Sequence, residues 1–564
     1  MHNFSSFSID KNFLLSALAL CLSISWLIPI HQVPWLSFNS DALAALVLLL
    51  PAWLIVFKTQ VSFRLDALGL AVVLCIISVW SQYLFGEIAS FGTAWIYALY
   101  LMGFLLAMLI GRAWQQKNPY QCSDFIFTAV LLGGLLSVVV QLCQLFEIGF
   151  SGGFVLPLSS SRYFANLGQS NQLGSLLMLS ILACAWFYIK GSVNGVFWLT
   201  LTIALAFGLA MTGSRTGWLN MSILAAGLFF YRNRGAAKKL LPGSIGLLVF
   251  YFSFVFFQPW VFIKNFFGYA LGDIAVRTIL DEARLQIWKG LISSRNDYFL
   301  TGYGWGQIPN SQTFYANSAL DLGGMVVQSH NLFFDLVLWV GLPVGFILFG
   351  LFFLWAFKLL YKLNDIRVLL MVFFLLVLFV HSMLEFPLHY AYFLLPAGLM
   401  AGAISQLTDS LAIKLPRFMV LLVLVVSTVA YSVTVKDYFI VEKGFLGLRF
   451  KQNGIQGVEA FPSGDIMVLT HLRDYIVFTT IDPLLHHSET DINLGRKVIS
   501  SFPSALGIYN FAAMLAFSGE SQEAEFWLNR ICKINNKSQC QIMEAYWTKL
   551  VDQNPSISHV RFEH

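Results

Sequence analysis

Long, unbroken apolar runs dominate this sequence and constrain its fold more than any other feature. Each run is about 17–25 residues long, which is the length that a helix needs to cross a bilayer. Inside a bilayer the backbone must satisfy its own hydrogen bonds, so such runs form helices. Strands of a β-barrel would alternate apolar and polar residues, and these runs do not. The sequence therefore predicts an all-α, polytopic helix bundle in a lipid bilayer.

The composition supports this class of fold. Apolar residues make up 58% of the 564 positions and charged residues 11%, about half the charge of an ordinary soluble domain. The net charge of +5 is small, and no basic cluster with interleaved aromatic residues indicates nucleic-acid binding. The seven cysteines show no CxxC pair and no metal-ligand spacing. The first apolar run has no small-residue cleavage site after it, so we interpret it as a spanning helix.

Thirteen spans are predicted from these runs. They cover residues 12–30, 41–57, 65–85, 92–111, 125–149, 173–189, 195–212, 217–231, 242–257, 331–357, 368–385, 390–406 and 418–435. The connecting loops alternate between those rich in Lys and Arg, such as 232–239 and 358–367, and those with almost none, such as 31–40 and 86–91. Because short cytoplasmic loops carry the basic excess, the N-terminus is predicted inside and the region from about 436 outside.

Two arginines, Arg162 and Arg215, are exceptions because they lie on the predicted outer side. A charge near a membrane end is costly unless it is paired or faces a polar cavity, although each alone could also extend to the lipid headgroups. Arg162 lies in a dense polar stretch, 159–172, and Arg215 in a turn of small residues, 212–217. Arginine binds phosphate with a planar fork and keeps its charge, which favours an anionic ligand.

A third outer segment, 258–330, contains a predicted amphipathic helix around 277–292 and ends at His330. Between them, residues 302–306 read Gly-Tyr-Gly-Trp-Gly, which we interpret as a flexible aromatic turn of the kind that stacks on sugar rings. A lone histidine at a span end is more often an interfacial residue, but histidine is also the side chain best suited to accept a proton near neutral pH. Arginines, amides and His330 on one face favour a site for an anionic, hydroxyl-rich ligand. His381, Glu385 and His389 add titratable groups, and helix-end packing explains them equally well.

The sequence contains no recognisable motif for a nucleotide or metal that would supply the energy of a transfer reaction. No GxxxxGK[ST] motif and no GxGxxG motif after a strand is present, and no acidic pair with a credible metal geometry faces outside. We therefore expect no cofactor and no metal, and a substrate that is already activated. A lipid-linked pyrophosphate sugar fits, because arginines could stabilise its leaving group as charge develops.

Several of these motifs together resemble a known family. They are Arg162–Asn166, Gly168–Gly174, Ser214–Gly217, Ser329–Asn331 and Glu385–Tyr390, and over most of the chain they are similar to the PglL-type bacterial protein O-oligosaccharyltransferases. These enzymes belong to the wider O-antigen ligase and polymerase superfamily, which shares the arginine and histidine motifs.

The resemblance implies a role for each matching residue. His330 matches the catalytic histidine, Arg215 an arginine that contacts the donor pyrophosphate, and Arg284 the second such arginine, with Arg277 as a rival. Further candidates for substrate binding are Arg162, Asn166, Gln169, Asn171, Glu385 and His389. The family also implies a bacterial inner membrane, a site facing the periplasm, an undecaprenyl-pyrophosphate-linked glycan donor, an acceptor protein such as a pilin, and no metal.

The C-terminal region differs in composition, so we predict a transmembrane glycosyltransferase domain over 1–435, including the periplasmic loop 258–330, and a helical periplasmic domain over 436–564. Residues 510–530 read like one tetratricopeptide-type helical hairpin with Gly519 at the turn. This domain would be either an acceptor platform or a lid that stabilises the membrane core. In this orientation Cys532 and Cys540 would face an oxidising compartment, where they could form a disulfide or remain two free thiols.

Three functions remain in competition at this stage. The leading hypothesis is transfer of an oligosaccharide to Ser or Thr hydroxyls of periplasmic or pilin proteins. An O-antigen ligase would instead use lipid A-core as the acceptor. A transporter of lipid-linked sugars would place charges and broken helices near the midplane, often in two related halves, whereas here the polar groups gather at one face.

Overall fold

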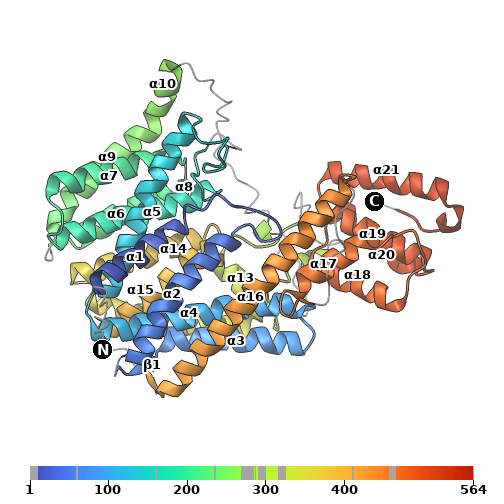
Figure 1. Ribbon diagram of the computed structural model, residues 1–564, viewed down its shortest axis with the longest axis horizontal. Coiled ribbons are helices and arrows are strands. Elements are labelled where there is room, and N and C mark those ends of the chain that lie inside the picture. Colours follow the sequence, from blue (N-terminus) through green and yellow to red (C-terminus); the bar gives the residue numbers. More distant parts are fainter. Residues whose placement is uncertain are drawn as a thin grey trace, which may run out of the picture. The chain divides into compact units, whose positions relative to one another are not determined.

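The protein is described as a computed structural model over residues 11–58, 61–158, 162–233, 237–267, 285, 287–289, 300–314, 325–408, 412–455 and 465–562. Helices make up nearly all of its regular structure (Figure 1). Eight of them are long and apolar enough to cross a membrane, and shorter apolar helices accompany them. The predicted all-α, polytopic membrane fold is confirmed.

The elements follow one another along the chain with these bounds. The first half contains α1 (Lys11–Ile24), α2 (Phe38–Lys58), β1 (Phe63–Leu65), α3 (Ala67–Leu84), α4 (Phe91–Lys117), α5 (Gln121–Leu145), α6 (Ser170–Ile189), α7 (Gly195–Met211), α8 (Arg215–Phe230), α9 (Ala237–Phe257) and α10 (Pro259–Phe266). The second half contains α12 (Ile308–Phe314), α13 (Leu332–Leu359), η2 (Leu360–Lys362), α14 (Ile366–Ser382), η3 (Pro387–His389), α15 (Ala391–Leu407), β2 (Ile413–Leu415), α16 (Arg417–Gln452), α17 (Thr470–Thr480), α18 (Glu489–Ser501), α19 (Ala505–Phe517), α20 (Ser521–Ile534), α21 (Lys537–Gln553) and η5 (Pro555–Ile557). Each predicted span overlaps one of these helices, but the number of thirteen spans stays a prediction, because eight of the described helices are long and apolar enough to cross a membrane.

The chain divides into two compact units. Unit 1 comprises Met1–Val72, Met102–Arg277 and Leu351–Thr428, and unit 2 comprises Val73–Leu101, Thr278–Gly350 and Val429–His564. The predicted domain boundary between 435 and 436 falls within α16, and the division into a membrane domain and a periplasmic domain stays a prediction.

Helix α6 is the centre of unit 1. It packs against α5, α7, α8 and α14. In its apolar stretch 78% of the residues are buried inside the protein, compared with 22% in that of α9. Small residues allow its neighbours to approach closely, since a Cβ on Gly134 of α5 would collide with Ser180 of α6. Two loops of the same unit are joined by the antiparallel strands β1 and β2, with Arg64 opposite Lys414.

Helices α17 to α21 of unit 2 follow one another as neighbours, each packed against the next (Figure 1). Helices α19 and α20 form the predicted hairpin, with Gly519 at a φ of +88° in its turn. A positive φ of this size is unfavourable for residues with a Cβ, so glycine suits this turn. Phe511, Leu528 and Ile531 are fully buried in the core between the helices.

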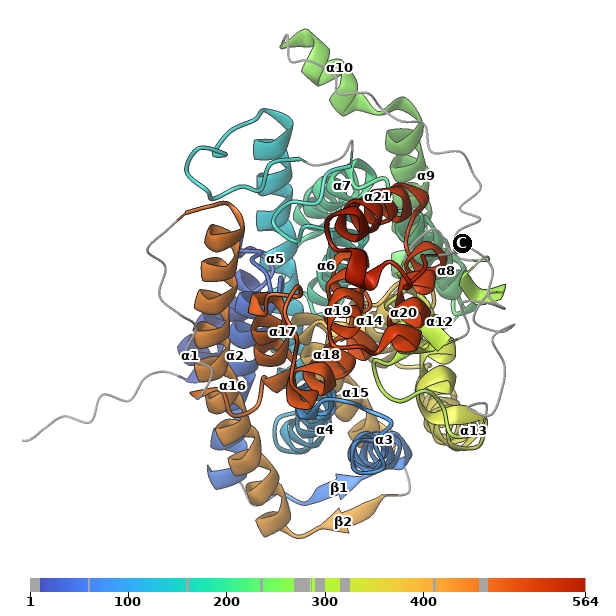
Figure 2. The same ribbon diagram turned by 90° about the vertical axis from the view of Figure 1, so that its right-hand side faces the viewer.

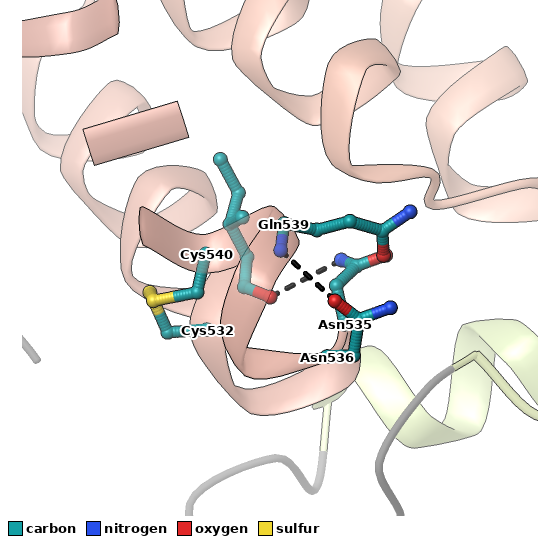
Figure 3. The surroundings of a disulfide bond; sticks show 6 residues. Cys532, Asn535, Asn536, Gln539 and Cys540 are labelled. Carbon is teal, nitrogen blue, oxygen red and sulfur yellow. Dashed lines mark hydrogen bonds between the residues drawn. A yellow bond between two sulfur atoms is a disulfide. The ribbon is translucent and has the colours of Figure 1, made fainter. Parts of the chain in front are cut away.

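A disulfide joins the last two long helices, between Cys532 of α20 and Cys540 of α21 (Figure 3). Their Cα atoms are 4.7 Å apart, within the range that a disulfide can bridge. Asn536 caps the second helix by accepting a hydrogen bond from the Gln539 N–H at 2.9 Å. Of the two alternatives left by the sequence, the structure has the disulfide.

One buried carboxylate connects α16 to the start of α17. Asp437 is fully buried, and its Oδ2 accepts hydrogen bonds from the backbone N–H groups of Met467, Val468 and Leu469 at 2.8, 2.6 and 3.2 Å. Backbone donors at the start of a helix lack partners within the helix. Asp437 therefore fixes the entry into the C-terminal helices.

We expect Asp437→Ala to destabilise unit 2, because three N–H groups, two of them on buried residues, would lose their carboxylate acceptor, at about 2 kcal/mol or more. Asp437→Asn keeps one acceptor oxygen and should cost less. Scanning fluorimetry in detergent would measure the lowered melting temperature. Lys436→Ala is the matched control, since Lys436 is exposed on the same helix, and equal melting temperatures for the Asp437→Ala variant and the control would contradict this role.

Candidate active site

Several sequence-predicted residues meet around one side chain of unit 1, Asn171 near the start of α6. Its Oδ1 accepts hydrogen bonds from Arg162 Nη2 at 2.8 Å and from Ser214 Oγ at 2.9 Å. Its Nδ2 donates to Glu385 Oε1 at 3.2 Å. Arg162 also donates through Nε to the carbonyl of Thr212 at 2.8 Å. Asn171 therefore connects three segments that are far apart in the sequence.

We call the set Arg162, Gln169, Asn171, Ser214 and Glu385 the Asn171 network. Gln169 joins it because its Nε2 donates to Glu385 Oε2 at 3.4 Å. Glu385 is buried and follows the end of α14. An uncharged amide thus lies between one cation and one carboxylate, which offsets the desolvation of both near a helix end.

The turn that precedes α8 is shaped to hold this network. Ser214 caps α8, and its Oγ accepts a hydrogen bond from the Gly217 N–H. Gly213 has a φ of +55°, and a Cβ there would lie 3.6 Å from Arg162 Nε. A Cβ at that distance would make an ordinary van der Waals contact, so the positive φ favours glycine at this position more than the available space does.

Arg215, the predicted pyrophosphate contact, is the first residue of α8 and is exposed, while Ser214 and Thr216 on either side are buried. The N-terminus of a helix carries partial positive charge, and backbone N–H groups there point outward. The local electrostatics at Arg215 therefore favour an anion such as phosphate.

Asn166, another candidate, has its amide engaged by the backbone of unit 1. Its Nδ2 donates to the carbonyls of Leu27 and Phe154, each at 2.8 Å, and its Oδ1 accepts from the Leu156 N–H at 3.1 Å. His31 contacts the Asn166 carbonyl at 2.8 Å. These contacts of Asn166 fix the conformation of the loop before α6. A role for Asn166 in substrate binding stays a prediction.

The two histidines near Glu385 differ in their surroundings. His381 is fully buried in α14, with its Nδ1 2.8 Å from Ser175 Oγ. His389 ends η3, where its ring lies 5.8 Å from that of Phe386. Burial among surrounding atoms lowers the pKa of His389 to about 4, although part of its surface stays accessible. His389 is therefore uncharged at neutral pH.

His330 belongs to unit 2 and lies in a tightly held turn, residues 328–331, which we call the histidine turn. Its φ is +58°, a left-handed conformation that costs free energy in a residue with a Cβ and often marks functional sites. On one side, the Ser329 carbonyl accepts from Trp288 Nε1 at 2.8 Å. On the other side, Asn331 caps α13 by accepting through Oδ1 from the Phe333 N–H at 3.0 Å.

Asp335 is a residue of this turn that the sequence analysis missed. Its side chain is buried in the first turn of α13, and its Oδ1 accepts from the Ser329 N–H at 2.7 Å. The His330 imidazole lies within electrostatic range of this carboxylate. The available signal was an acidic residue placed five positions after His330 at a membrane end, where a charge is costly without a function or a partner.

The glycine–aromatic segment, residues 302–306, was predicted wrongly. Trp305 is only 3% exposed, and its Nε1 donates to Ser78 Oγ at 2.9 Å. Its ring packs 4.7 Å from that of Trp339. A buried tryptophan of this kind anchors the segment to the core of unit 2 and is not a surface on which a sugar can stack.

Arg284, Arg277 and most of the predicted amphipathic helix lie outside the described residues. Within the part of the chain that the structure describes, no group of three His, Cys, Asp or Glu side chains could hold a metal ion. Metal independence stays a prediction.

Comparison with known proteins identifies the class. Residues 199–349 match the family described as O-Antigen ligase, and residues 369–544 match the family described as Virulence factor membrane-bound polymerase, C-terminal. The chain is 25% identical over 548 residues, 94% of each chain, to the General O-oligosaccharyltransferase of Acinetobacter baylyi. It is 27% identical to the ComP-specific O-oligosaccharyltransferase of the same organism over 327 residues, 58% of this chain and 59% of that relative.

The fold and these matches indicate a membrane-bound glycosyltransferase that is similar to the O-antigen ligases and membrane-bound polymerases. Among these proteins the chain is similar to bacterial protein O-oligosaccharyltransferases, the family that its sequence motifs also resemble.

We expect Asn171→Ala to lower glycosyl transfer by about tenfold or more, because Arg162 and Glu385 would lose a shared partner and its orienting effect. Asn171→Asp keeps the acceptor for Arg162 but places a second carboxylate beside Glu385, so it should restore little activity. The measurement is product formed per folded molecule in purified membranes.

Asn194→Ala provides the matched control for Asn171. Asn194 is exposed and only caps α7, where it accepts from the Phe197 N–H. Its replacement should leave transfer unchanged. Full activity in the Asn171→Ala variant would remove the Asn171 network from the candidate site.

Proposed function

We propose that this protein transfers an oligosaccharide from an undecaprenyl-pyrophosphate carrier to Ser or Thr hydroxyls of periplasmic proteins such as pilins. The observation that carries the proposal is the similarity to a protein O-oligosaccharyltransferase over 94% of both chains, because it includes the C-terminal region as well as the membrane helices.

The proposed reaction is a single displacement that inverts the anomeric centre. His330 removes the proton of the acceptor hydroxyl as its oxygen forms a bond to the anomeric carbon. The bond from that carbon to the pyrophosphate oxygen breaks, and the pyrophosphate leaves on its lipid with the electron pair. Arg215 and Arg284 bind the pyrophosphate and stabilise the charge that develops on it.

The contacts of the histidine turn support this role for His330. A general base must hold its position within tenths of an ångström during proton transfer. The backbone on both sides of His330 is fixed by Trp288, Asp335 and the capping residue Asn331. The residue that resembles the family's base therefore occupies the strained centre of a well-fixed turn.

The proposed location is the bacterial inner membrane, with the site facing the periplasm. The alternation of basic loops supports this orientation. The Cys532–Cys540 disulfide supports it independently, because disulfides persist in the periplasm and are rare in the cytosol.

The orientation predicts that Cys532 and Cys540 are oxidised in cells. Alkylation of intact membranes without reductant should leave the peptide that spans both cysteines unmodified, and reduction should then allow two alkyl groups to be added. Mass spectrometry would detect both states. Full alkylation before reduction would place the C-terminal helices in a reducing compartment.

His330→Ala should abolish acceptor glycosylation while the protein remains in the membrane, because no other described group replaces the base at that turn. The test expresses the protein with a glycan locus and a candidate pilin, and measures the intact mass of the pilin. His559→Ala is the control, since His559 is exposed and contacts only the Ser521 hydroxyl among the hydrogen bonds described. Full glycosylation by the His330→Ala variant would contradict the proposal.

An O-antigen ligase is the second candidate, since the match to that family covers residues 199–349 and includes His330. The same experiment distinguishes the two functions. Glycan on the pilin supports the first candidate, glycan on lipid A-core the second, and glycan on neither acceptor would contradict both.

A further inference from the structure

Helix α12 lies in the loop before His330 and contacts the C-terminal helices of unit 2. It packs against α18 and α20 (Figure 2). Its side chains are unusually polar for such a position, yet Ile308, Ser311, Gln312 and Thr313 are all buried. Helices this short are marginal in isolation. The conformation of α12 therefore depends on the surface that α18 and α20 provide.

One side chain of α20, Arg530, makes a polar contact with α12. Its Nε donates to the carbonyl of Thr313 at 3.2 Å. The last carbonyls of a helix lack partners within the helix, and a cation is favourable there. The guanidinium also lies 3.4 Å above the ring centroid of Phe526, and Nη1 donates to the Phe526 carbonyl. The stacking on Phe526 orients the Arg530 guanidinium so that its Nε can donate to the Thr313 carbonyl.

The contact between Arg530 and α12 is connected to the histidine turn through Gln312, the residue next to Thr313. Gln312 Oε1 accepts from the Val326 N–H at 2.8 Å, and Val326 precedes the histidine turn by only two residues. The other end of the segment is fixed to α13, because Gly304 N donates to the Trp339 carbonyl at 3.1 Å and Tyr303 N to that of Leu338 at 2.7 Å. The chain is therefore fixed at Val326, before His330, and at Leu338 and Trp339, after it.

From these contacts we infer that Arg530 is a positioning residue for glycosyl transfer. It fixes α12, and α12 fixes the histidine turn through Gln312. The C-terminal helices then form part of the support of the proposed base, in addition to any part in binding an acceptor. The inference rests on the proposed function of His330.

Arg530→Ala should lower kcat for acceptor glycosylation on the order of tenfold or more, because a small displacement of a reacting group is costly. The KM for the acceptor should stay unchanged, since Arg530 acts on the base. Arg530→Lys keeps a cation that can reach the Thr313 carbonyl but loses the flat stacking on Phe526, so it should restore part of kcat. Rates are expressed per folded molecule, with membrane abundance and melting temperature measured for each variant.

Arg473→Ala is the matched control. Arg473 is another half-buried arginine of the C-terminal helices, and it pairs with Asp474 within α17 at 2.8 Å, away from the helices that contact α12. Its loss should affect the melting temperature as much as the loss of Arg530 and leave kcat close to that of the unchanged protein. A kcat for Arg530→Ala equal to that of the control would overturn the inference. A rise in acceptor KM alone would also overturn it, because that result identifies an acceptor-binding platform.

Gln312→Met tests the same connection from α12 and does not depend on the folding of the C-terminal helices. It keeps the volume of the side chain but removes the acceptor for the Val326 N–H. It should lower kcat, and the double variant with Arg530→Ala should be no worse than the poorer single variant, because both act in one chain of contacts. Independent, multiplying effects would contradict the connection.

If His330→Ala were fully active in this assay, the proposed function would fail. If that variant were inactive and Arg530→Ala fully active, only this inference would fail.

Discussion

A charged side chain close to a membrane must find a partner, and in unit 1 one neutral amide meets that requirement for a cation and an anion together. Asn171 accepts from Arg162 and donates to Glu385, which only a side chain with both an acceptor and donors can do. An aspartate there would repel Glu385, and a leucine would leave both charges without this partner. The amide stands at the start of α6, the helix that packs against α5, α7, α8 and α14. The polar network and the apolar bundle therefore share their central element.

The sequence predicted the parts of the fold that depend on length and hydropathy alone. A helix occurs at every predicted span because the bilayer imposes one solution on long apolar runs. The ends of the helices were less predictable. Helix α1 ends at Ile24, before the predicted 30, and the hydroxyls of Ser23 and Ser25 bind carbonyls of its last turn. Helix α16 continues to Gln452, past the predicted 435, because a helix need not stop where its apolar run stops.

The candidate site was predictable only as a set of residues. Basic-residue counting placed Arg162, Asn171 and Glu385 on one side of the membrane, but it could not show that Asn171 joins the other two. The glycine–aromatic segment shows the opposite error. Its composition is typical of an exposed turn, yet Gly302 is there because a Cβ would collide with the Trp339 backbone. A close approach between distant backbones leaves no local pattern, so glycines alone could not distinguish a buried anchor from a flexible turn.

The proposed mechanism requires the segment before His330 to present one imidazole in one place. Ordering each residue costs about 1–2 kcal/mol of conformational entropy, and α12, with only seven residues, is too short to offset that cost alone. The described contacts solve this by holding the segment at separated points: Trp305 in the core of unit 2, α12 on the C-terminal helices, and Asn331 at the start of α13. Losing any one of these points would leave the ends fixed and the turn between them loose. In the proposed mechanism, the C-terminal helices that contact α12 therefore contribute to positioning His330, separately from any part in binding an acceptor.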